Sequence, residues 1–219
     1  MRNSWFISIL PVLLAGCVSV APRGLVRDPS ADFPGPAPFA NYTPPTDSRL
    51  YKATLEIKDH RLTGLLIIKY MAPLEPGSRR DHGSYRVVFT SEVGMTFFDL
   101  ELKERHTRVI SCFPSLKKRA LLHLLGSNFR KLTWESAPPA GRAYRQKSTG
   151  NLVMDGRRSK TRYWYVYSPA GDTLNGLSAR SSASTAVKIG FSRYDKDQPG
   201  VITLENPLIG MKMTLKNLH

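Results

Sequence analysis

The sequence predicts a mostly β protein, with a minor α component, whose single antiparallel sheet curls into a half-open barrel of roughly nine to eleven strands under one covering helix. Three observations lead to this fold class. Strand-like runs separated by turn residues recur from residue 50 to the C-terminus. Only one segment has a convincing helical pattern. A single sheet of this size must curl or close, because large twisted sheets rarely stay flat.

A four-stranded antiparallel meander is expected from Leu50 to Leu102. Residues 51–58 alternate apolar and polar side chains, as in a strand with one buried and one exposed face. Residues 61–71 follow after a two-residue turn and have apolar side chains on both faces, which favours a central strand. Two further strands and a candidate fifth are expected at residues 85–89, 96–102 and 108–112.

The predicted helix spans residues 114–125. Proline suits its first turn, and Gly126 suits its end. Its apolar stripe consists of Leu116, Ala120, Leu121, Leu124 and Leu125. A loop is expected at residues 138–150. The later strands are expected at residues 161–168, 185–192, 201–205 and 211–215.

Residues 1–16 have the pattern of a secretory signal peptide. A positive charge at Arg2 precedes an apolar run that is too short to span a bilayer as an anchor. Leu14-Ala15-Gly16-Cys17 resembles the lipobox of bacterial lipoproteins at all four positions. The resemblance implies that Cys17 is acylated and becomes the first mature residue. The alternative is an ordinary signal peptide with a chance cysteine.

Residues 17–49 are expected to form a lipidated tether in front of a domain at residues 50–219. Seven prolines lie between residues 22 and 45 with few apolar residues among them, so this segment should not fold. Residue 18 is valine, and by resemblance to bacterial sorting rules the missing aspartate favours the outer membrane. The domain is expected on its periplasmic face, with display on the cell surface left open.

The chain is strongly basic, with a formal net charge of +15 that falls to +14 when the signal peptide and its Arg2 are removed. Basic clusters with neighbouring aromatic residues would suggest nucleic acid in a cytoplasmic protein, but a secreted lipoprotein does not meet it. Anionic membrane lipids are the expected partner. A solvated basic surface is the alternative.

The sequence contains no recognisable catalytic motif, and we expect no enzyme activity. The histidines are scattered, and spacing alone is weak evidence for a metal pair of His82 and His106, so no metal is expected. No cofactor is expected beyond the covalent acyl groups on Cys17. Cys112 is interpreted as a small buried residue.

Three segments resemble LolB, the outer-membrane lipoprotein receptor, whose fold the periplasmic carrier LolA shares. They are residues 63–65, 88–102 and 210–215. The resemblance implies an eleven-strand half barrel with a helical lid, an apolar cavity for acyl chains and a LolA-like carrier as partner. It also implies that Val93, at the tip of a loop, helps to pass lipoproteins into the membrane. The alternative for Val93 is a turn residue that packs on its own hairpin.

The expected function is therefore that of an outer-membrane lipoprotein that binds acyl chains and receives or inserts other lipoproteins. The residues expected to line its cavity are Leu66, Ile68, Phe89, Phe98, Leu100, Leu121, Leu124 and Leu125. The alternative is a structural or interaction lipoprotein of the envelope that retains the fold without transport.

Overall fold

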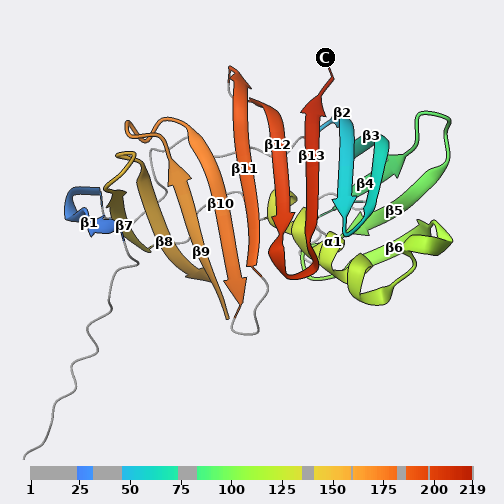
Figure 1. Cartoon of the computed structure of the whole chain (residues 1–219), viewed down its shortest axis with the longest axis horizontal. Helices are drawn as coiled ribbons and strands as arrows, with labels where there is room; N and C mark the ends of the chain where they lie inside the picture. The colour runs from blue at the N-terminus through green and yellow to red at the C-terminus, as the bar shows by residue number, and fades with distance from the viewer. Residues whose placement is uncertain are drawn as a thin grey trace, which may run out of the picture.

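The computed structural model describes residues 24–31, 46–73, 83–134, 141–158, 160–181, 186–196 and 198–218. They form one antiparallel sheet of 13 strands with one α-helix and three short 3-10 helices (Figure 1). The mostly β class with a single helix is confirmed, and the strand number exceeds the predicted nine to eleven. The sheet curls without closing, which is consistent with a half-open barrel. The predicted signal peptide and Cys17 lie outside the described residues.

The sheet joins the later part of the chain to the earlier part through the pairing of β13 with β2. Met211 lies opposite Ile57 in this pair, and Leu215 lies opposite Ala53. The strands follow one another across the sheet in the order β1 (Leu25–Arg27), β7 (Gly141–Gln146), β8 (Leu152–Arg158), β9 (Thr161–Tyr167), β10 (Leu174–Ser181), β11 (Ala186–Asp195), β12 (Gln198–Asn206), β13 (Met211–Asn217), β2 (Ser48–Ile57), β3 (His60–Met71), β4 (Ser84–Thr90), β5 (Thr96–Leu102) and β6 (Thr107–Cys112). Strands β1 and β6 are therefore the two edges of the sheet.

Four strands were not predicted. Strand β7 lies inside the predicted loop at residues 138–150, and β1 lies inside the predicted tether. The two strands pair with each other, and the Asp28 carboxylate accepts a hydrogen bond of 2.8 Å from Arg145. Strands β8 and β10 contain glycine and polar residues that weaken their local strand pattern. Pairing with β9, which lies between them, holds both in the sheet.

The predicted helix was wrong at both ends. Residues Pro114–Leu116 form the 3-10 helix η2, Lys118 has an extended backbone, and α1 spans Arg119–Thr133. The helix continues through Gly126, whose missing side chain allows α1 to pack closely against β6. A Cβ atom at this position would lie 2.4 Å from the Oγ1 atom of Thr107 on β6.

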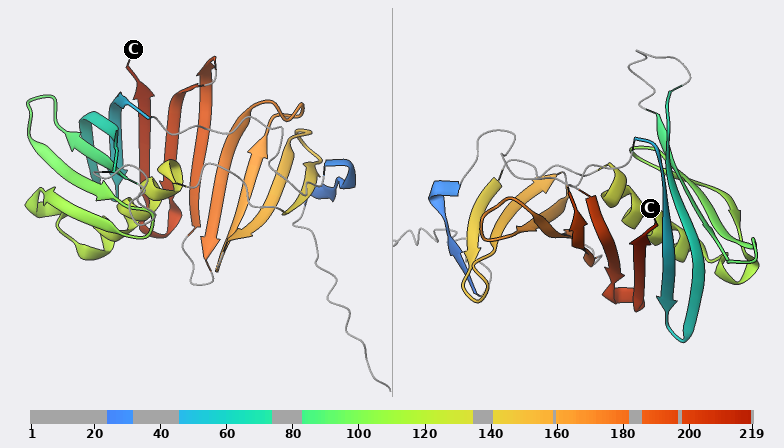
Figure 2. Two further views of the ribbon diagram at one scale, coloured as in Figure 1. Left: turned by 180° about the vertical axis from the view of Figure 1, so that it is seen from behind. Right: turned by 90° about the horizontal axis from the view of Figure 1, so that it is seen from above.

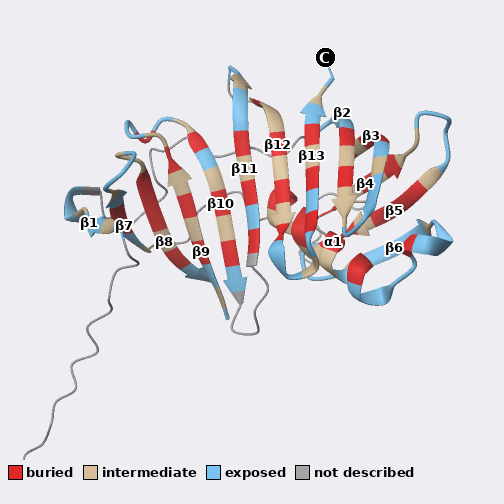
Figure 3. Ribbon diagram, viewed as in Figure 1, coloured by how far each residue is buried: buried red, intermediate tan, exposed pale blue. Residues whose placement is uncertain are grey.

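Helix α1 lies on the concave side of the sheet (Figure 2). Its buried face packs against β5 and β6, and the ring of Phe129 lies 6.1 Å from that of Phe98. Along the strands, buried residues alternate with more exposed ones, as the banding in Figure 3 shows. The other 3-10 helices are η1 (Pro29–Ala31) and η3 (Pro207–Ile209).

Candidate functional site

A pocket of about 370 Å³ lies between the beginning of α1 and two neighbouring turns of the sheet. One turn connects β2 to β3, and the other is η3, which connects β12 to β13. Because β13 pairs with β2, both turns lie at the same end of the sheet. The volume is within the range of roughly 300–1,000 Å³ that is typical of small-ligand pockets.

The walls of this pocket, called the α1 pocket below, are mostly apolar. Strand ends, 3-10 helices and one side of α1 contribute apolar side chains in every direction. They are Ile57, Leu62, Leu116, Ala120, Leu121, Leu124 and Ile209. Leu116 and Leu121 are buried, whereas Leu124 and Ile209 are half-buried, so part of the apolar surface remains open to a ligand.

The remaining lining residues are polar, and two of them are lysines. Lys58 occupies the two-residue turn of the β2–β3 hairpin with a φ of 50°, a left-handed conformation that costs a non-glycine residue about 1–2 kcal/mol. Lys118 lies in the extended link between η2 and α1. Ser115 and His60 complete the lining. The arrangement fits a ligand with an apolar chain and an anionic or strongly polar end.

Five of the predicted cavity residues do not border the α1 pocket. Leu66, Ile68, Phe89, Phe98 and Leu100 come from β3, β4 and β5, and all five are fully buried in the core that α1 covers.

The three helix residues of the predicted set are divided between the α1 pocket and the core. Leu121 and Leu124 line the α1 pocket, and Leu125 lies in the core with 1% of its surface exposed. Three further apolar residues of the pocket, Ile57, Leu62 and Ile209, were not predicted. The first two stand at the ends of the predicted hairpin strands, where continued alternation could have pointed to them.

Asn128 lies one helical turn beyond Leu124 and is buried, with 1% of its surface exposed. Neither polar atom of its amide has a hydrogen-bond partner among the described residues. An unsatisfied buried amide destabilises the folded state by about 1–3 kcal/mol. Asn128 is thus a polar residue on the mostly apolar buried side of α1.

Val93 lies at the tip of the β4–β5 turn and is 90% exposed. The turn is held by a hydrogen bond of 2.8 Å from the Ser91 N–H to the Met95 carbonyl, and by one of 2.9 Å from the Met95 N–H to the Ser91 hydroxyl. Gly94 has a φ of 84°, which glycine adopts readily. The turn therefore presents Val93 to solvent. It lies at the same end of the antiparallel strands as the β2–β3 turn.

No group of three or more metal-ligating side chains occurs among the described residues, and His82 is not one of them. Cys112 is half-buried and not fully buried as predicted. Partial burial raises the pKa of its thiol, which donates a hydrogen bond of 3.4 Å to the Phe113 carbonyl. Within the described ranges, no helix is long and apolar enough to span a membrane.

No protein-family model matches the sequence, and no curated protein matches it. Among solved structures, a candidate outer membrane lipoprotein-sorting protein domain from Vibrio parahaemolyticus aligns with a TM-score of 0.37 and 8% sequence identity. The alignment covers 81% of this chain and 86% of the other. A likeness of this size does not assign the chain to a family.

Proposed function

We propose that this protein binds acyl chains in the α1 pocket and that it receives or inserts lipoproteins at the outer membrane. The observation that supports this proposal is the pocket itself, whose walls are apolar and whose polar lining includes Lys58 and Lys118. The proposal includes a lipid anchor on Cys17, a position on the periplasmic face and a LolA-like carrier as the donor. The proposed role is binding and transfer, without a chemical reaction.

Burial of apolar chain supplies the binding energy in this proposal. Each methylene group that leaves water contributes about 0.8 kcal/mol, so eight methylenes in the pocket would contribute about 6 kcal/mol before the entropic cost of binding. The lysines would attract an anionic or ester end of the ligand. Leu208, which is 54% exposed on η3 beside Ile209, would extend the apolar surface toward a membrane.

The experiment uses the protein without its signal peptide and with Cys17→Ser, so that it carries no lipid of its own. Titration with a fluorescent fatty acyl probe should give saturable binding. Ala120→Trp fills the pocket and should abolish that binding, whereas Ala170→Trp, in the exposed β9–β10 turn, should not. Absence of saturable binding by the unsubstituted protein would contradict the proposal.

A second candidate is an interaction lipoprotein of the envelope that does not transport. It is favoured by the full burial of Leu66, Phe89 and Phe98, because the side chains expected to surround several acyl chains fill a packed core instead. Transfer of an acylated lipoprotein from a LolA-like carrier to vesicles separates the two candidates. Probe binding without transfer would favour the second.

A further inference from the structure

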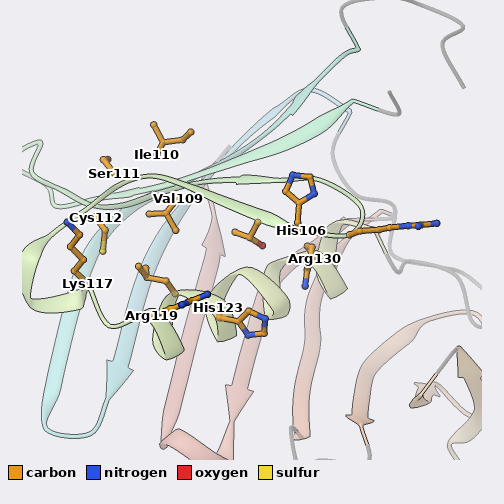
Figure 4. Close-up of a pocket in the computed structure, with 12 residues that line it drawn as sticks. His106, Val109, Ile110, Ser111, Cys112, Lys117, Arg119, His123 and Arg130 are labelled. Carbon is orange, nitrogen blue, oxygen red and sulfur yellow. The ribbon is translucent and has the colours of Figure 1, made fainter. Parts of the chain in front are cut away.

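A second and larger hollow lies on the other side of α1. This groove, of about 940 Å³, is bounded by the edge strand β6 and by α1, and is called the β6 groove below (Figure 4). On the helix, Leu122 and Arg119 face this groove, whereas Leu121 and Leu124 face the α1 pocket. The helix therefore separates two hollows with different linings.

The β6 groove is basic. Four cationic side chains line it, namely Arg105, Lys117, Arg119 and Arg130, and no carboxylate is among its lining residues. In the part of the chain that the structure describes, Arg105, Lys117 and Arg119 form no ion pair. These three cations are available to an anionic ligand.

Several other arginines of the sheet are paired with neighbouring carboxylates, whereas Arg180 and Arg193 form no ion pair among the described residues. Arg86 binds Asp99 through two hydrogen bonds of 2.7 and 2.6 Å. Arg108, on β6 itself, binds Glu101 at 2.6 Å. The groove differs from these paired positions because its lining holds cations and no carboxylate.

Cationic side chains lie along the whole groove, with Arg119 between its two ends, and apolar side chains lie beside them. Figure 4 shows Lys117 toward one end, His106 and Arg130 toward the other, and Val109 between them. Leu122 adds a second apolar side chain to the lining. A ligand that matches this surface combines anionic groups with an apolar body.

The geometry of β6 argues against an added peptide strand. The β5–β6 register shifts between Asp99 and Leu100, and Ile110 is left without a partner on β5. Such a bulge disrupts the ladder and twists an edge away from further pairing. Recognition in this groove therefore depends on side chains.

We propose that the β6 groove binds the phosphate-bearing headgroup of an anionic lipid. Arginine presents paired N–H donors to phosphate oxygens, and Lys117 adds a point charge. Val109 and Leu122 would contact the glycerol and the first part of the chains. This site is independent of acyl binding in the α1 pocket, from which the helix separates it.

The test uses a short-chain anionic phospholipid, dihexanoylphosphatidylglycerol, below its micelle concentration, with the unlipidated full mature chain in a calorimeter. We expect saturable binding that is at least tenfold weaker for dihexanoylphosphatidylcholine and for inorganic phosphate. Each basic side chain near an anionic lipid contributes roughly fivefold, or about 1 kcal/mol. Lys117→Glu with Arg119→Glu should therefore weaken binding by about 25-fold or more.

The matched control is Lys69→Glu with Lys216→Glu, which reverses the charge of two exposed lysines away from the groove. It should change the affinity less than twofold. Equal losses in both double variants would overturn the proposal, because binding would then follow net charge alone. Equal affinity for inorganic phosphate, or tighter binding of an acidic peptide, would also overturn it. If reversal unfolds the protein, Lys117→Gln with Arg119→Gln should still weaken binding about 25-fold.

Ala120→Trp distinguishes this proposal from the proposed function. The variant should lose the fatty acyl probe and retain the anionic lipid. If the unsubstituted protein binds the anionic lipid but not the fatty acyl probe, acyl binding in the α1 pocket is contradicted. The proposal for the β6 groove remains supported by that result. Loss of both ligands in Ala120→Trp would contradict the independence of the two sites.

Discussion

Replacement of Gly126 by alanine tests the contact that sets the distance between α1 and β6. An added Cβ would lie 2.4 Å from Oγ1, 2.6 Å from Cγ2 and 2.8 Å from Cβ of Thr107. Threonine is branched at Cβ, so rotation about χ1 cannot remove all three contacts. The helix must therefore move away from β6, and the β6 groove must change its width.

Two opposing effects determine the size of the change. Alanine stabilises a helix interior by about 1 kcal/mol relative to glycine. Overpacking in a filled interior costs about 1–3 kcal/mol. We therefore expect Gly126→Ala to lower the free energy of unfolding by about 0–2 kcal/mol. In a Thr107→Ala background two of the three close atoms are gone, and the same substitution should recover about 1–2 kcal/mol.

The unlipidated protein, Gly126→Ala, Thr107→Ala and the double variant form a double-mutant cycle. Urea unfolding followed by circular dichroism measures the stability of all four. A loss of 1 kcal/mol should lower the melting temperature by about 2–4 °C for a domain of this size. His123 lies on the exposed side of the helix, so His123→Ala changes the helix propensity without affecting the contact with Thr107. This control should stabilise the fold by about 0.5 kcal/mol. Stabilisation of about 1 kcal/mol by Gly126→Ala alone would refute the close approach.

Four further predictions concern the core, the apolar turn, a buried amide and the response to alkaline pH. Phe129→Ala should destabilise the fold by about 3–5 kcal/mol in urea unfolding, because a large ring that is 1% exposed leaves a cavity. Val93→Leu should tighten vesicle binding about fourfold and Val93→Ala should weaken it about fifteenfold, at about 0.8 kcal/mol per carbon; unchanged flotation with vesicles in both would exclude membrane contact by this turn. Asn128→Leu should raise the free energy of unfolding by about 1–3 kcal/mol, since it removes an unsatisfied buried amide, and a loss of stability would indicate that the amide has a partner in solution. Burial raises the pKa of Tyr194 from 10 to about 12, so its stabilising contribution is complete below pH 10 and is lost as the pH rises through 12. Between pH 9 and 12 the free energy of unfolding should therefore fall less steeply in Tyr194→Phe than in the unsubstituted protein.

Local pattern and turn length were enough to predict the hairpin of β2 and β3. The alternation from Tyr51 to Lys58 fixes which side chains share a face, and a two-residue turn sets the register. In the structure Ile57 lies opposite His60, which confirms the hairpin, although its turn consists of Lys58 and Asp59 and not of the predicted Asp59 and His60. These features depend only on neighbours in the chain.

The end of the helix could not be predicted in the same way. Gly126 resembles a helix terminator when only neighbouring residues are considered. Its role inside α1 depends on contact with Thr107, which the fold brings to it. The short strand β1 was not predicted for a similar reason: its pairing partner β7 comes much later in the chain.

The predicted cavity set shows the limit of apolar patterning. Leu66, Phe89 and Phe98 are buried on the inner face of the sheet, as inward-pointing residues should be. The sequence does not distinguish a side chain that fills a core from one that lines a cavity, because the difference depends on how closely α1 packs. Acyl binding by these residues stays a prediction, as does lipidation of Cys17.

The sequence by itself determined the mostly β class, the antiparallel meander and the presence of one helix, because each follows from periodicity over a few neighbouring residues. Only the tertiary structure decided where a ligand could bind. The α1 pocket joins Ile57, Ile209 and Leu124 through the pairing of β13 with β2. The β6 groove likewise joins Arg105, in the turn before β6, to Arg119 on α1, without carboxylates in its lining. Both hollows depend on contacts between segments far apart in the chain, which no local pattern records.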